Sequence, residues 1–178
     1  MSQTADRYAK AFFELAQEQK CLEAVQVSLT DIRKLIIDLS EFHQFLNNPI
    51  LSYEERCVIL KALFEGKIPE LSLKFILFVT YKKRLSILLN ITESFDRLYL
   101  ASTNQLRAYV TTALPIEEAD KVSFNQRLSD KFQHHILARW TTNPSLIGGF
   151  RVFIKGQMYD YSFKNQLNRF YQQAVQSA

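Results

Sequence analysis

The chain has 178 residues, of which 47% are apolar and 13% aromatic, so it is long enough to bury a core in one domain or in two small ones. Its most apolar run, LSLKFILFVTY at 71–81, is too short to cross a bilayer and contains Lys74, which excludes a transmembrane helix. The net charge of +4 is compatible with nucleic acid, an anionic membrane surface or an acidic protein as the partner.

The first predicted helix lies at the N-terminal end and is apolar over an unusually wide arc. This arc covers about 200° of the helical wheel, whereas a surface helix over a single core needs about half as much. Its apolar positions are Ala5, Tyr8, Ala9, Ala11, Phe12, Phe13, Leu15 and Ala16. Such a helix is either buried deep in a bundle or offers a second flank to a partner, and the pattern leaves both possibilities open.

Five further helices are predicted before residue 104, because apolar residues recur at helical spacing while Gly and Pro are rare. They cover residues 21–40, 41–48, 51–66, 69–85 and 85–102. Ser52 and Glu55 have the spacing of a capping box, and Gly66 suits the C-terminal end of the same helix. The helix at 69–85 has almost no polar face, so we expect it to be buried on nearly every side.

The pattern changes near residues 102–104, where alternating residues replace helical spacing. Strands are predicted at 105–113, 135–142, 150–156 and around 157–160, with one helix opening at Pro115 and a terminal helix capped by Asp160 or Ser162. The predicted fold is therefore mainly α, with an N-terminal six-helix bundle at 1–104 followed by a small α+β C-terminal domain at 105–178. The first part has 13 basic and 13 acidic residues and the second has 9 and 5, so the second carries the positive excess.

The pair Gly148 and Gly149 is the obvious candidate for a phosphate-binding loop. However, neither the G-x-x-x-x-G-K-[ST] spacing nor the G-x-G-x-x-G spacing is present. Because the pair directly precedes a predicted strand, we interpret it as a bulge or as a place where another backbone approaches closely.

No set of residues with the spacing of a catalytic site is found. His134 and Asp130 have no third ligand at a useful spacing, so neither a metal nor another cofactor is predicted. Cys21 and Cys57 lie among apolar helical neighbours and lack a C-x-x-C spacing, which indicates inert thiols in a reducing compartment. The basic cluster YKKRL at 81–85 leaves one alternative open, a helical adaptor protein with a small basic nucleic-acid-binding module.

Five motifs, in this order along the chain, resemble those of one family. They are RYAKAFFELA at 7–16, FLNNPILSYEER at 45–56, KKRLSILLNITESFDRL at 82–98, VTTALPIEEADK at 110–121 and NPSLIGGFRVFIKGQMYDYSFKNQLNRF at 143–170. This family is the delta subunit of F-type ATP synthase, whose mitochondrial equivalent is the oligomycin sensitivity-conferring protein. The resemblance covers essentially the whole chain, and the last motif is the most specific.

The resemblance implies a noncatalytic stator subunit that links the catalytic head to the peripheral stalk, resists rotor torque and is required for coupling proton transport to ATP synthesis. It implies that residues 1–104 bind the N-terminal segments of the alpha subunits, and that residues 105–178 bind the b-type stalk subunits. The chain is then monomeric within the complex, binds no nucleic acid and meets the membrane only indirectly. A missing leader favours the cytoplasmic face of a bacterial inner membrane over an organelle.

The family's groove for the alpha subunit lies between the first and fifth helices. It carries over onto Tyr8, Ala11, Phe12, Leu15, Phe75, Phe78 and Val79. The wide apolar arc of the first helix and the nearly all-apolar fifth helix suit a groove that receives an amphipathic partner helix.

The family's stalk-binding module carries over onto the second half of the chain, at Gly148, Gly149, Arg151, Asp160, Ser162 and Leu167. Three positions depart from the family pattern: Asn143 replaces an Asp, Tyr161 replaces a Gly, and a Gly common before the second strand is replaced within KFQHHI at 131–136. Tyr161 is therefore expected to avoid a positive φ.

Overall fold

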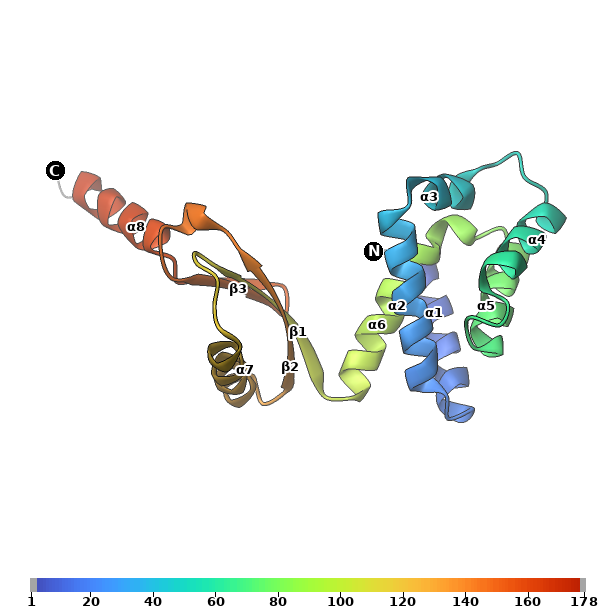
Figure 1. Cartoon of the computed structure of the whole chain (residues 1–178), viewed down its shortest axis with the longest axis horizontal. Helices are drawn as coiled ribbons and strands as arrows, with labels where there is room; N and C mark the ends of the chain where they lie inside the picture. The colour runs from blue at the N-terminus through green and yellow to red at the C-terminus, as the bar shows by residue number, and fades with distance from the viewer. Residues whose placement is uncertain (1–2, 177–178) are drawn as a thin grey trace. The chain divides into compact units, whose positions relative to one another are not determined.

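A computed structural model of the chain describes residues 3–176, with side chains described for residues 3–172. The fold is mainly helical with a small mixed four-stranded sheet, as the sequence predicted (Figure 1). The chain divides into two compact units, Met1–Tyr99 and Leu100–Ala178.

The first unit, as far as its residues are described, is built from helices and the turns between them. Its elements are α1 (Gln3–Glu18), α2 (Leu22–Asp38), α3 (Ser40–Asn47), α4 (Tyr53–Phe64), α5 (Glu70–Tyr81), the 3₁₀ helix η1 (Leu85–Ile87) and α6 (Leu88–Ser102). Fully buried side chains from all the longer helices form one core, and the largest of them are Phe12, Phe95, Leu29, Ile32, Leu60, Ile76, Leu88 and Ile91. Each such side chain contributes roughly 1.5–3 kcal/mol when it leaves water, so this core supports the unit.

The start of α4 has the capping box that the sequence predicted. The backbone amide of Glu55 donates to the Ser52 hydroxyl at 3.2 Å, and the backbone amide of Ser52 donates to the Glu55 carboxylate at 2.9 Å. The Ser52 backbone amide, and after it the Ser52 side chain, lower the pKa of Glu55, because hydrogen bonds to the carboxylate favour its charged form. Gly66, with φ of +73°, follows the C-cap residue Glu65 and ends the helix as expected.

Two sets of polar interactions connect α6 to α2 and α1. The buried Asp96 accepts a hydrogen bond from Gln26 of α2 at 2.7 Å and lies 3.5 Å from the Arg33 guanidinium. On α1, Asp6 pairs with Arg97 at 3.0 Å. Because a buried carboxylate needs partners, these residues fix how α6 lies against α1 and α2.

The second unit is a sheet with helices at its face and end. Its elements are β1 (Gln105–Thr112), α7 (Glu118–Phe132), β2 (His135–Thr142), η2 (Pro144–Leu146), β3 (Phe150–Ile154), β4 (Gln157–Asp160) and α8 (Phe163–Gln176). The strand order is β2-β1-β3-β4, with β1 parallel to β2 and the other pairs antiparallel. All four strand predictions are confirmed, but α7 begins three residues after Pro115, so the predicted helix start was wrong. Glu117 keeps an extended backbone (ψ 155°) and delays the helix.

One face of this sheet is covered by α7 (Figure 1). Phe124, Leu128 and Phe132 of α7 pack on buried strand residues such as Val110 and Val152. The Phe124 ring meets Phe150 edge-on at 4.9 Å between centroids. Residues on alternate strand positions point to the opposite face, which α7 does not cover.

Candidate protein-docking sites

Aromatic rings join α1 to α5 and leave an apolar surface between these helices. Tyr8 lies 6.2 Å from Phe78 between ring centroids, and Phe12 stacks on Phe75 at 3.8 Å with planes 4° apart. Since later positions on α1 meet earlier positions on α5, the two helices are antiparallel. We define the α1–α5 face as Tyr8, Ala11, Leu15, Phe75, Phe78 and Tyr81.

The α1–α5 face is apolar yet accessible. Phe78 is 47% exposed, Tyr81 63% and Leu15 40%, while Ala11 is exposed and leaves room for a close approach. The prediction that the helix at 69–85, which is α5 in the structure, is buried on nearly every side was therefore wrong. α5 buries Ile76, Val79 and Thr80 and presents the rest of its apolar surface outward.

Two of the predicted groove residues lie beneath this face rather than on it. Phe12 is 1% exposed and Val79 is fully buried, so neither is available to touch a partner. Both belong to the core of the first unit, where Phe12 supports Phe75 from below. The resemblance named inner and outer residues together, and the periodicity of an all-apolar helix does not distinguish its inner from its outer flank.

Basic residues follow the α1–α5 face at the C-terminal end of α5. The Lys82 ammonium lies 5.5 Å from the Phe78 ring centroid and 5.2 Å from that of Tyr81. Lys83 and Arg84 are exposed, and along the described part of the chain neither forms an ion pair. The sequence analysis missed Tyr81 as a surface residue, although its position one turn after Phe78 could have indicated it.

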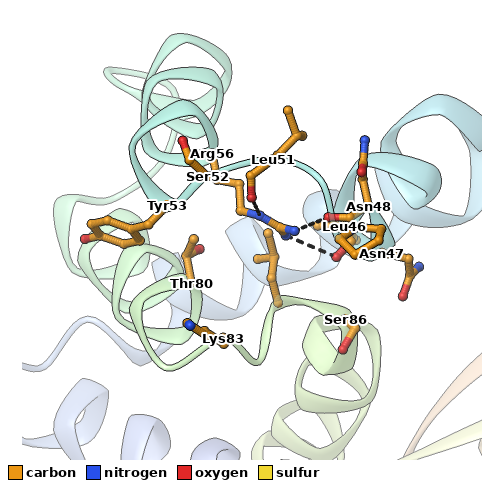
Figure 2. Close-up of a pocket in the computed structure, with 12 residues that line it drawn as sticks. Leu46, Asn47, Asn48, Leu51, Ser52, Tyr53, Arg56, Thr80, Lys83 and Ser86 are labelled. Carbon is orange, nitrogen blue, oxygen red and sulfur yellow. Dashed lines mark hydrogen bonds between the residues drawn. The ribbon is translucent and has the colours of Figure 1, made fainter.

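A cavity of about 400 Å³ opens between the α3–α4 loop and the end of α5. Figure 2 shows the side chains that line it. The Arg56 side chain reaches from α4 into this loop and donates to the carbonyl oxygens of Leu51 at 3.2 Å, Leu46 at 3.5 Å and Asn48. Because its guanidinium is used by these carbonyls, Arg56 braces the loop instead of binding a ligand. This explains why an Arg belongs to the motif FLNNPILSYEER, a role that sequence reasoning did not find.

The Gly148–Gly149 pair is the point where two chain segments of the second unit approach closely. A Cβ atom at Gly148 would collide with the Phe163 ring, and one at Gly149 would collide with the Tyr161 carbonyl oxygen. Gly149 also has a φ of +75°. The prediction of a close backbone approach before a strand is thus confirmed at Gly149.

Asp160 links the sheet to the start of α8. Its carboxylate pairs with Arg151 at 2.7 Å and accepts hydrogen bonds from the Ser162 hydroxyl at 2.6 Å and the Ser162 amide at 3.0 Å. Burial alone would raise the pKa of Asp160, but the bonds from Ser162 and the Arg151 guanidinium together lower it. The Ser162 hydroxyl in turn accepts the amide of Asn165, so Ser162 caps α8 while Asp160 holds Ser162.

The departures from the family pattern at Asn143 and Tyr161 leave these turns intact. Asn143 accepts the Ser145 amide at 3.0 Å, as an Asp would. Tyr161 is not among the residues with positive φ, as expected.

The outer surface of α8 is apolar and exposed at Leu167 (58%), Phe170 (67%) and Tyr171 (72%). These residues recur at helical spacing on one stripe of the helix. The six predicted stalk-module residues therefore have different places: Gly148, Gly149, Asp160 and Ser162 build the base of α8, Arg151 braces Asp160, and Leu167 lies on the exposed stripe.

A cavity of about 300 Å³ opens between α7 and the sheet of the second unit. Its lining is mainly aromatic and includes Phe124, Phe150 and Tyr159. The Lys131 ammonium lies 5.3 Å from the Tyr159 ring centroid and 5.9 Å from that of Phe132, so it covers one side of the opening.

Residues 3–176 contain no cluster of three His, Cys, Asp or Glu residues that could hold a metal ion. The ring of His134 instead meets the Phe132 carbonyl oxygen through Nδ1 at 2.5 Å. Within the same residues, no helix is both long enough and apolar enough to pass through a lipid bilayer.

A helical unit with an exposed apolar face, followed by a basic α+β unit, is typical of a structural subunit that binds other proteins. Residues 4–174 match the family described as ATP synthase delta (OSCP) subunit. The chain therefore belongs to the ATP synthase delta (OSCP) family.

Individual relatives agree with the family match. ATP synthase subunit delta of Desulforamulus reducens is 32% identical over 163 residues, covering 92% of this chain and 90% of the relative. The same subunit of Halalkalibacterium halodurans is 29% identical over 172 residues, covering 96% of this chain and 94% of the relative. A chain in the cryo-EM structure of the Toxoplasma gondii mitochondrial ATP synthase hexamer shares the fold, with a TM-score of 0.76 at 22% identity over 98% of both chains.

Family membership gives the chain its role. It is a noncatalytic subunit of the stator of F-type ATP synthase, a component of the peripheral stalk. The alternative of an adaptor with a nucleic-acid-binding module has no support in these matches. The basic residues 82–84 instead lie beside the exposed apolar α1–α5 face.

Proposed function

We propose that the first unit binds the N-terminal segment of an alpha subunit of the catalytic head on the α1–α5 face, with α1 to α6 acting together as one six-helix module. The observation that carries this proposal is that two aromatic side chains of α5, Phe78 and Tyr81, are exposed. In helix-in-groove docking the inserting helix carries apolar anchors at i, i+3 or i+4 and i+7. Tyr8, Ala11 and Leu15 form an apolar stripe on α1 against which such a helix can pack. Phe12 and Val79 support the face from beneath.

The test of this site is a charge placed at Phe78. Phe78→Asp should weaken binding of a synthetic peptide with the alpha-subunit N-terminal sequence by at least about a hundredfold, because the carboxylate must lose water against an apolar helix. Calorimetry with the full chain measures the affinity, and circular dichroism measures helicity. Val27→Asp on α2 is the matched control, since Val27 is 57% exposed and lies outside the face. Unchanged affinity for Phe78→Asp would reject the site, whereas collapse of the fold would place Phe78 in the core.

The second unit is proposed to hold the b-type subunits of the peripheral stalk. Gly148, Gly149, Asp160 and Ser162 set the direction of α8, and the exposed stripe that includes Leu167 supplies an apolar contact for a stalk helix. The excess of basic residues in this half of the chain suits an acidic partner. Leu167→Glu is expected to weaken co-purification of the stalk without releasing the head.

With the head bound by the first unit and the stalk by the second, the chain resists the torque of the rotor and keeps proton transport coupled to ATP synthesis. The bacterial relatives favour a position on the cytoplasmic face of a bacterial inner membrane, reached only through the complex. Fractionation tests this position: the chain should stay with membranes that hold the intact synthase and leave them when the head and stalk are stripped off.

A further inference from the structure

The face of the sheet opposite α7 carries an exposed apolar row. In the strand register, Arg139 of β2 lies beside Tyr109 of β1, Tyr109 beside Phe153 of β3, and Phe153 beside Met158 of β4. The row thus crosses all four strands at one level. We define the open sheet face as these four residues together with Leu137 and Lys155.

The side chains of this row are too apolar for an ordinary solvent face. Tyr109 is 44% exposed, Phe153 39% and Met158 56%, and the rings of Tyr109 and Phe153 lie 6.4 Å apart between centroids. The uncovered face of such a sheet is normally polar. A contiguous patch of aromatic and thioether side chains on it indicates an interaction site.

The charge around the row is positive. Arg139 and Lys155 are exposed, and among the described residues neither takes part in an ion pair. Asp160 also points to this side, but it is already paired with Arg151. A partner that covers the apolar row would therefore gain from acidic residues beside its own apolar stripe.

The dimensions suit one helix. Four neighbouring strands span about 14 Å from first to last, and a helix with its side chains is roughly 10 Å across. An extended strand would need a free sheet edge instead of a face, because its backbone must hydrogen-bond to another strand.

We propose that the open sheet face binds an acidic amphipathic helix of the peripheral stalk, as a contact separate from the stripe on α8. The assignment to the stalk rests on the function proposed above. Tyr109, Phe153 and Met158 supply the apolar contact, and Arg139 and Lys155 flank it with positive charge.

The experiment measures the affinity of the full chain for the purified extramembrane fragment of the stalk b subunit by calorimetry. Phe153→Glu should weaken binding about tenfold or more, because it places a carboxylate in the middle of the row, and Arg139→Glu should weaken it by a smaller factor. Phe153→Tyr should bind as the unaltered chain does. Val122→Glu is the matched control, since Val122 is 69% exposed on the outer side of α7 and should leave the affinity unchanged.

The outcomes separate this inference from the proposed function. The inference would be overturned if the unaltered chain binds the fragment and both Phe153→Glu and Arg139→Glu bind it equally well. The α8 stripe would then remain as the stalk contact. Failure of the unaltered chain to bind the fragment would overturn the stalk role itself and this inference with it. If Phe153→Glu lowers the melting temperature, the affinity of Arg139→Glu alone tests the inference. Arg139 is exposed on the edge strand β2, so its substitution removes no core packing.

Discussion

The ring of Phe12 on α1 stacks on the ring of Phe75 on α5, with centroids 3.8 Å apart and planes 4° apart. The Phe12 ring centroid also lies 5.5 Å from that of Phe95 on α6, so the Phe12 side chain contacts two other helices. The floor of the proposed alpha-subunit site is therefore part of the core, while its surface is formed by the outer rings of α5.

This arrangement predicts unequal effects for two phenylalanines that the resemblance placed in one groove. Phe12→Ala should lower the free energy of unfolding by about 3–5 kcal/mol, because it empties a buried site. Phe78→Ala should lower it by about 1 kcal/mol or less, because that ring is half exposed. Urea unfolding of the full chain, followed by helical circular dichroism, measures both. Equal losses would show that Phe78 is a core residue and not a docking residue.

Two glycines with nearly the same φ provide a second prediction. Gly149 (+75°) and Gly156 (+77°) both have a left-handed backbone, so a Cβ at either costs about 1–2 kcal/mol. At Gly156 the Cβ meets open space, whereas at Gly149 it meets the Tyr161 carbonyl oxygen. Gly149→Ala should therefore cost about 1–3 kcal/mol more than Gly156→Ala in thermal unfolding of the second unit.

The larger substitution Gly149→Val extends this prediction to the complex. It should harm the fold or the stalk attachment of residues 105–178, while the released head continues to hydrolyse ATP. Loss of hydrolysis by the head would contradict it. A stalk attachment as strong as that of the unaltered chain would also contradict it.

The sequence predicted the elements of this chain well because Gly and Pro are rare and the apolar periodicities are strong. The strand at 105–113 and the helix at 51–66 with its capping box are examples. What it could not predict was which flank of α1 and α5 lies inward, since both flanks are apolar. The alternation in β1 and β3 did put Tyr109 and Phe153 on the face opposite Val110 and Val152. Only the strand register shows that they are neighbours.

The cap of α4 predicts a local effect in the first unit. Ser52→Ala removes the hydroxyl that accepts the Glu55 amide and should lower stability by about 1 kcal/mol. Glu55→Gln should be milder than Glu55→Ala, because an amide oxygen still accepts the Ser52 backbone amide. Urea unfolding midpoints compare the three variants. If Glu55→Ala is as stable as Glu55→Gln, the hydrogen bond from the Ser52 amide to the side chain at position 55 contributes nothing to stability.

The lowered pKa of Asp160 predicts a loss of stability in acid. A carboxyl whose pKa is lower in the folded state than its ordinary value of 3.8 stabilises the fold above that value, and this contribution disappears as the pH falls through the folded pKa. Unfolding of the second unit should therefore depend more steeply on pH below about 4 in the unaltered chain than in Asp160→Asn. Identical pH profiles would show that the Arg151 and Ser162 contacts do not favour the charged form.

Salt provides the last prediction, because the proposed stalk contact is partly electrostatic. Basic residues exceed acidic ones by 9 to 5 in residues 105–178, and Arg139 and Lys155 lie beside the apolar row of the open sheet face. Affinity of the full chain for the stalk fragment should fall as NaCl rises from about 50 mM to about 500 mM, since the screening length shortens to a few ångströms. Arg139→Glu should bind more weakly at low salt and respond less to added salt, whereas Phe153→Glu should keep the salt dependence of its remaining contacts. An affinity that does not change with salt would contradict the electrostatic part of the stalk contact while leaving the apolar part to be judged by Phe153→Glu.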